Sequence, residues 1–198
     1  MELGMKKLKH LTAIFLVLMI WGSVGGCGSS PEIYLDPEAD IEFYERVGVV
    51  PFWGGGSERG SSDLITDAFT TALMVSEKYM VVEPGHFRHM YGEEIGAKAT
   101  SVRGLTPDMV KTLGERAQVQ AIFEGTLLAY QQSRSGQSQF PMITLEVRMI
   151  DVATGRLVWM TTINRSGGPN VPFFGFGETH TLPELALEIT RELVERVP

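Results

Sequence analysis

The chain of 198 residues contains a single cysteine, Cys27, and fewer basic than acidic residues. One cysteine cannot form an internal disulfide or a cysteine-rich metal site, so neither can stabilise this fold. Lys and Arg number 17 against 24 Asp and Glu, and no basic stripe occurs, which excludes the usual features of a nucleic-acid-binding protein. The apolar segment from Leu11 to Trp21 has eleven residues, whereas a membrane-spanning helix needs about 20.

Catalytic motifs are also scarce. The sequence contains neither a G-x-S-x-G nucleophile motif nor an H-E-x-x-H zinc motif. The segment from Gly55 to Ser62 nearly matches a P-loop and lies between a predicted strand and a predicted helix. However, Ser61 occupies the position of the phosphate-binding lysine, and Glu58 would repel phosphate groups. A flexible connector is the alternative interpretation, and a helix N-terminus that binds an anion stays open.

A histidine pair is the remaining candidate for metal chemistry. His86 and His89 are three residues apart, and Glu93 and Glu94 follow closely, so one helical face could present several ligands. No third histidine is near, and solvated surface residues are the alternative interpretation. We therefore expect a protein that is not an enzyme, with no cofactor and no metal. A nucleotide- or metal-dependent enzyme is kept as the least favoured function.

The N-terminal region has the order of a secretory signal peptide. Lys6, Lys7 and Lys9 precede the apolar segment, and the small residues "GSVGG" lead directly to Cys27. This order predicts that residues 1–26 are a signal peptide. Cys27 itself is compatible with a buried small side chain, a reactive thiol or a site of covalent modification.

The residues "VGGC", Val24 to Cys27, resemble the lipobox of bacterial lipoproteins. The resemblance implies cleavage before Cys27 and a diacylglycerol on its sulfur, so that the lipid bilayer becomes a partner of the chain. Gly28, in place of an aspartate, favours sorting to the periplasmic face of the outer membrane. An ordinary signal peptide with an incidental cysteine is the alternative.

Removal of residues 1–26 leaves 172 residues with 14 basic and 23 acidic side chains, a net charge of −9. A chain of this length favours one compact domain. Residues 27–44 are polar, acidic and interrupted by Pro31 and Pro37, which predicts an acylated cysteine followed by a flexible tether. The folded domain is predicted over residues 45–198.

The domain has the pattern of an α/β fold. Short β-branched segments alternate with helical periodicity, and three strands then follow one another as an antiparallel meander. Ser61 or Ser62, Thr106 and Thr181 are predicted helix N-caps, with Pro107 and Glu184 supporting the second and third. The predicted order is β-α-β-α-β-β-β-α, forming one mixed sheet flanked by helices.

An aromatic loop separates the last strand from the last helix. Phe173, Phe174 and Phe176 lie among glycines and prolines in "GGPNVPFFGFGETH". A loop that folds back over the sheet is one interpretation. The other, which we adopt as a hypothesis, is an exposed contact site for a partner or a membrane.

Several segments together resemble the CsgG-like lipoproteins, the curli production assembly/transport family. They are "RVGVVPF", "YMVVEP", "AQVQAIFEGTLLAY" and "TLEVRMIDVATGRLVW", and the resemblance covers roughly residues 46–197. It implies the periplasmic α/β domain of that family. The curli secretion channel adds two long transmembrane hairpins, whereas "QQSRSGQSQFP" is short and polar, so we expect no such hairpins and no pore here.

The resemblance implies a non-enzymatic module in envelope assembly or secretion that contacts other envelope proteins or associates with itself, without nucleic acid. A lipoprotein activator of a peptidoglycan synthase, a class with a similar periplasmic fold, is the alternative function. The matching segments are structural, so they indicate a fold more strongly than a function.

Overall fold

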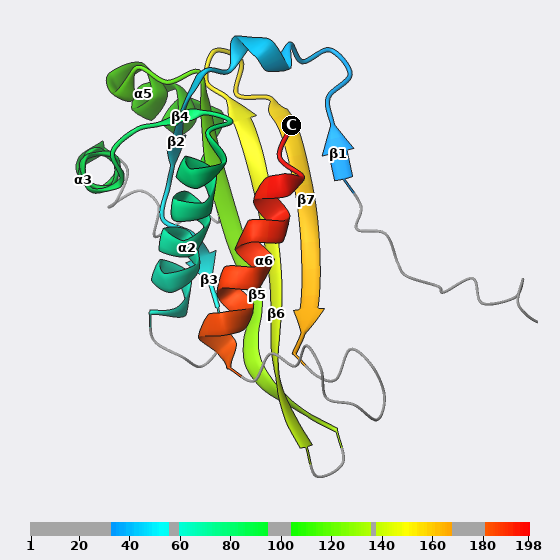
Figure 1. Ribbon diagram of the computed structural model, residues 1–198. Coiled ribbons are helices and arrows are strands. Elements are labelled where there is room, and N and C mark those ends of the chain that lie inside the picture. Colours follow the sequence, from blue (N-terminus) through cyan, green and yellow to red (C-terminus); the bar gives the residue numbers. More distant parts are fainter. Residues whose placement is uncertain (1–32, 56–59, 95–103, 136–137, 168–180) are drawn as a thin grey trace, which may run out of the picture. The chain divides into compact units, whose positions relative to one another are not determined.

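The computed structural model describes residues 33–55, 60–94, 104–135, 138–167 and 181–198, which form one α/β domain (Figure 1). A mixed seven-stranded sheet and its flanking helices confirm the predicted fold class. The strands are β1 (Ile33–Leu35), β2 (Arg46–Val49), β3 (Trp53–Gly54), β4 (Met80–Val81), β5 (Ala121–Ser135), β6 (Ser138–Asp151) and β7 (Leu157–Ser166). The helices are η1 (Ile41–Phe43), α2 (Ser61–Ser76), α3 (Pro84–Glu94), α5 (Pro107–Ala117) and α6 (Leu182–Glu195).

The sheet combines a parallel part and an antiparallel part in the order β1-β7-β6-β5-β2-β4. β2 lies between β4 and β5 and is parallel to both, as expected for strand–helix–strand units. β5, β6 and β7 form the predicted antiparallel meander, and β3 pairs with β5 outside the main path. Val47, Val49 and Val50 are buried, in agreement with a strand covered on both faces.

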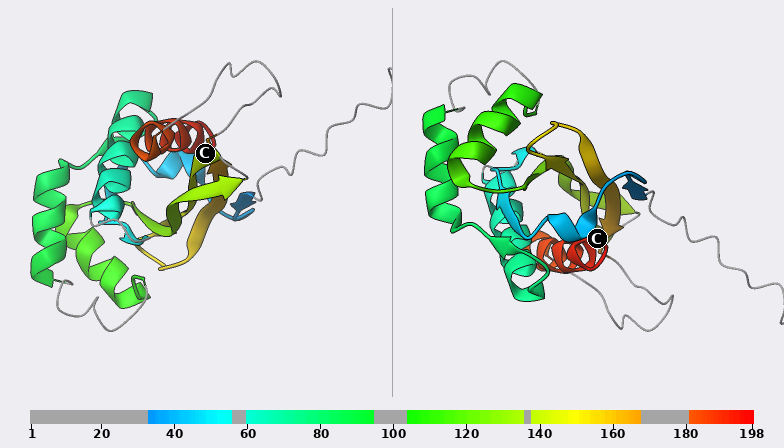
Figure 2. Two further views of the ribbon diagram at one scale, coloured as in Figure 1. Left: turned by 90° about the horizontal axis from the view of Figure 1, so that it is seen from below. Right: turned by 90° about the horizontal axis from the view of Figure 1, so that it is seen from above.

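Helices cover both faces of the sheet (Figure 2). α2 and α6 pack on one face and α3 and α5 on the other, because neighbouring residues of a strand point to opposite sides. Phe123 of β5 belongs to the first core and contacts Phe69 and Trp159 edge-on, while Ile122 belongs to the second. The apolar stripe predicted for α6 is buried in the first core.

Two of the three predicted caps are present. The Thr106 hydroxyl accepts a hydrogen bond from the Met109 amide at 3.4 Å, and the Thr181 hydroxyl accepts one from Glu184 at 3.3 Å. The predicted serine cap of α2 is wrong. Gly60, with a left-handed φ of 79°, holds the N-cap position, and Ser61 is a buried residue of the first turn.

The folded domain begins earlier than the predicted boundary at residue 45. β1 pairs antiparallel with β7, and the Asp36 amide donates a hydrogen bond to the Val158 carbonyl at 2.8 Å. Tyr44 is buried in the core. Residues 33–44 therefore belong to the fold and form a strap along the sheet edge. Their polar, proline-containing composition is typical of a flexible tether, so the sequence did not predict this strap.

The polar segment after Tyr130 is also more regular than expected. β5 continues to Ser135 and β6 starts at Ser138, so the strands pair through most of the segment predicted as an eleven-residue tip. Backbone pairing within a hairpin does not require an apolar face, which explains why the sequence pattern hides it.

Candidate functional site

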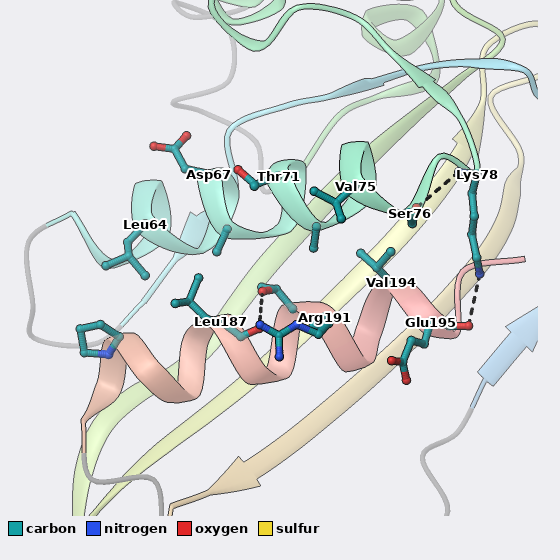
Figure 3. A pocket seen from close by; sticks show the side chains of 14 residues that line it. Leu64, Asp67, Thr71, Val75, Ser76, Lys78, Leu187, Arg191, Val194 and Glu195 are labelled. Atoms are coloured by element: carbon teal, nitrogen blue, oxygen red, sulfur yellow. Dashed lines mark hydrogen bonds between the residues drawn. The ribbon is translucent and has the colours of Figure 1, made fainter.

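A groove lies between α2 and α6 on the described surface (Figure 3). Its volume is about 870 Å³. Leu64, Ala68, Ala72 and Val75 of α2 supply one wall, at the spacing of one helical stripe. The second wall comes from α6, and the lining there consists of Pro183, Leu187, Thr190, Arg191, Val194 and Glu195.

The groove exposes apolar side chains to solvent. Val75 is 77% exposed and Leu187 54% exposed, although both helices already bury a full apolar stripe against the sheet. The small side chains of Ala68 and Ala72 leave a hollow between these two larger residues. Such a hollow lined by apolar atoms is suited to receive an apolar side chain from a partner.

Charges of both signs surround the groove. Lys78 donates through Nζ to the carbonyl oxygens of Glu195, at 3.2 Å, and Val197, and Asp67 pairs with Arg88 at 2.8 Å. Arg191 adds a second base to the lining, and the Glu195 side chain adds a second acid. The groove therefore carries two acids and two bases, unlike the strongly acidic chain as a whole.

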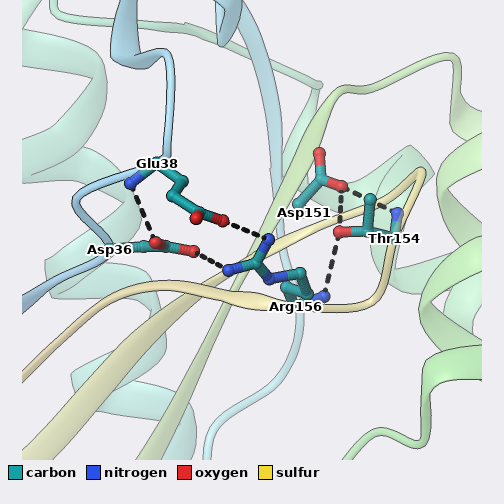
Figure 4. A network of polar contacts seen from close by, with 5 residues as sticks. All are labelled: Asp36, Glu38, Asp151, Thr154 and Arg156. Carbon is teal, nitrogen blue, oxygen red and sulfur yellow. Dashed lines mark hydrogen bonds and ion pairs between the residues drawn. The ribbon is translucent and has the colours of Figure 1, made fainter.

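A polar network holds the N-terminal strap against the turn between β6 and β7 (Figure 4). Arg156 pairs with Asp36 at 2.9 Å and with Glu38 at 3.2 Å. Burial, followed by the charge and hydrogen bond of Asp151, raises the pKa of Tyr44 to about 12. These contacts join the strap to the sheet and identify a structural role for Asp151.

A second buried carboxylate is Glu124 on β5. Arg148 of the neighbouring strand donates to it from Nε at 2.8 Å and from a terminal nitrogen at 2.6 Å, and the Leu105 amide donates at 2.9 Å. This arrangement satisfies the carboxylate and fixes the start of the segment before α5. Burial, with a contribution from the Glu124 charge, raises the pKa of Tyr91 nearby. The arrangement has the chemistry of a structural ion pair.

The P-loop-like segment is only partly described, and Glu58 lies outside the described residues. The Gly55 amide donates to the Leu127 carbonyl at 2.7 Å, so it is already engaged in the sheet. Ser61 is buried, and the left-handed conformation of Gly60 serves the start of α2. The described ends of the segment therefore have structural roles.

The histidine pair lies on α3, where His86 and His89 are exposed. His89 lies 3.3 Å from Glu93, and Arg116 of α5 pairs with Glu93 at 2.6 Å and with Glu94. The hydrogen bond from Arg116 lowers the pKa of Glu93. Within the described ranges, no three His, Cys, Asp or Glu side chains are grouped to hold a metal ion.

Cys27, Phe173, Phe174 and Phe176 lie outside the described residues. The lipid attachment and the aromatic contact site therefore stay predictions. The groove was not expected from the sequence. Its only signal is that Met74 and Val75 follow Leu73, so the apolar residues at the end of α2 extend beyond one stripe.

None of the helices in the part of the chain described above has the length and apolarity needed to cross a membrane. No family model matches the sequence. No curated protein matches it either.

Solved structures share the fold. The PelC dodecamer from Paraburkholderia phytofirmans is 14% identical, with a TM-score of 0.55 over 83% of this chain and 94% of that chain. Lipoprotein GNA1162 from Neisseria meningitidis is 17% identical, with a TM-score of 0.53 over 76% and 99%. The hypothetical protein CT253 from Chlamydia trachomatis is 10% identical, with a TM-score of 0.53 over 77% and 95%. At these identities the likeness concerns the fold.

Proposed function

We propose that this chain is an outer-membrane-anchored periplasmic lipoprotein that acts as a non-enzymatic interaction module in envelope assembly or secretion. The observation that carries the proposal is the position of Cys27. It follows a predicted signal peptide and precedes the first strand of the folded domain by six residues. An acyl group at this position would hold the whole domain at a membrane surface.

The fold is compatible with this role. GNA1162, which is described as a lipoprotein, aligns over nearly its entire length. The secretion-associated part of the proposal rests on the resemblance of the sequence to CsgG-like lipoproteins.

We extend the proposal to self-association through the α2–α6 groove. PelC, which shares the fold, is a dodecamer. Copies with a net charge of −9 repel one another, so a self-contact is most favourable where the local charges balance. The groove offers such a region, since its apolar lining carries two acids and two bases. The proposed occupant is a second copy of the chain.

The anchor is tested on protein extracted from membranes. Mass spectrometry should find acyl mass on residue 27, and Cys27→Ser should leave the protein soluble or uncleaved. One acyl chain gives only marginal membrane binding, so the two or three chains of a lipoprotein are needed for permanent attachment. A wild-type protein without acyl mass at residue 27 would refute the proposal.

Affinity capture from membranes tests the interaction role. Envelope assembly or export proteins, or further copies of the chain, are expected, whereas a peptidoglycan synthase would support the alternative function. The triple change Phe173→Ser, Phe174→Ser and Phe176→Ser examines the aromatic loop. If the triple variant no longer captures partners and its thermal midpoint is unchanged, the loop is a contact site. If the triple variant unfolds, the three phenylalanines belong to the core.

A further inference from the structure

The edge strand β1 exposes an unusual set of side chains. Ile33, Tyr34 and Leu35 are 50%, 46% and 47% exposed, and they comprise the entire strand. Their register with β7 places Ile33 and Leu35 on one face and Tyr34 on the other. The strand is thus apolar on both faces and stands at the end of the sheet.

Edge strands normally carry charged residues or are otherwise protected from contact. The opposite edge is limited by its length, because β4 has only two residues, of which Met80 is 63% exposed and Val81 is partly buried. β1 contains no charged residue, although acidic residues follow it directly. An apolar edge of this kind favours contact with a partner surface.

The length of the chain before β1 identifies that surface. Five residues lie between Cys27 and Ile33, and the six Cα–Cα steps that join them can span at most about 20–22 Å. If the sulfur of Cys27 carries acyl chains in a bilayer, β1 cannot lie farther than this from the lipid headgroups. It is the nearest described element to the anchor along the chain.

We propose that Ile33, Tyr34 and Leu35 form a membrane-contact patch that lies in the headgroup region of a lipid surface. This inference rests on the proposed lipid anchor. Tyr34 combines an apolar ring with a hydroxyl group, the combination favoured at membrane interfaces. No described strand pairs with the outer edge of β1. The backbone groups of that edge need hydrogen-bond partners, which headgroups and interfacial water supply but hydrocarbon does not.

The strap fixes the patch rigidly to the rest of the domain. β1 pairs with β7, and Asp36, directly after it, pairs with Arg156 at 2.9 Å. A patch held in this way orients the body on the membrane. Since Asp40 and Glu42 nearby are exposed acids, we expect zwitterionic lipid to be preferred over anionic lipid.

A labelled cysteine tests the patch. In the acylated protein the sulfur of Cys27 is blocked, so Tyr34→Cys provides the single thiol for an NBD fluorophore. Met80→Cys is the matched control, because Met80 is apolar, 63% exposed and located on β4, the edge strand at the opposite end of the sheet and outside the α2–α6 groove. Both proteins are reconstituted on phosphatidylcholine vesicles, and the emission maximum and the rate of quenching by external dithionite are measured.

The label at residue 34 should shift to the blue and be quenched several-fold more slowly than the label at residue 80, and added phosphatidylglycerol should reduce the difference. Equal quenching at the two positions on floating vesicles would overturn the patch and leave the anchor intact. Protection at residue 34 without vesicles that increases with protein concentration would assign the edge to a second copy instead. Failure of the protein to float with the vesicles would refute both the anchor and the patch.

Discussion

The two helical layers of the domain differ in what they present to solvent. In the described part of the chain, no large exposed apolar residue belongs to α3 or α5. Their outer surface is closed by ion pairs, among them Arg116 with Glu93 at 2.6 Å and Lys111 with Glu115 at 4.0 Å. α2 and α6 instead expose Met74, Val75 and Leu187.

Both layers bury an apolar stripe against the sheet, so the difference does not arise from the needs of the fold. The outer surface of α3 and α5 is charged and solvated, whereas the outer surface of α2 and α6 contains an apolar groove. Exposed apolar side chains that the core does not use are typical of interaction surfaces. The comparison therefore indicates a structural role for α3 and α5 and supports the proposed binding role of α2 and α6.

The largest loss of stability is expected where α3 packs against the sheet. A Cβ on Gly48 would lie 2.1 Å from Cζ of Phe87, which is fully buried. We expect Gly48→Ala to lower the free energy of unfolding by about 2–3 kcal/mol through overpacking. Urea denaturation measures it, and Gly92→Ala on α3 is the control, because nothing lies within 4 Å of that position. Equal stability of the two variants would show that α3 can shift without cost.

Removal of a helix cap should cause a stability loss of intermediate size, and it can be compared between the two layers. Thr106→Ala on α5 and Thr181→Ala on α6 should each cost about 1 kcal/mol, because each removes the acceptor of an N-terminal amide. Thr112→Ala serves as the control, since its hydroxyl bonds only to the Asp108 carbonyl one turn earlier. A cost at Thr181 well below that at Thr106 would mean that α6 is less dependent on its first turn.

The smallest effect on stability is expected at the charged surface of α3 and α5. Arg116→Gln removes the pairs with Glu93 and Glu94, but these side chains are substantially exposed, so the loss of stability should be smaller than that of either cap variant. Thermal unfolding at low and high salt should show the difference shrinking as salt increases. A large, salt-independent loss would indicate that the pairs position α3.

Local signals predicted the fold more reliably than the site. Thr106 and Pro107 specify the start of α5 within a few residues, so the sequence alone indicates it. β1 forms only through pairing with residues about 125 positions away, and its three residues have no period of their own. The Glu124–Arg148 pair likewise depends on strand register.

The groove could not be predicted for a related reason. Leu64 and Leu187 belong to helices that are far apart in the sequence, and nothing local indicates that these helices lie side by side. Only the excess of apolar residues at the end of α2 suggests an additional surface. The aromatic loop, by contrast, is conspicuous in the sequence and lies outside the described residues.

Sedimentation velocity of the acylated protein in detergent tests the binding role of the α2–α6 face most directly. Wild type is compared with the double variant Val75→Lys and Leu187→Lys, and with Met80→Lys and Leu128→Lys as a control at exposed apolar residues outside the groove. We expect wild type and the control to form the same oligomer, and the groove variant to sediment as a monomer with unchanged unfolding. A groove variant that assembles like wild type, or a wild type that remains monomeric at all concentrations, would contradict the assignment.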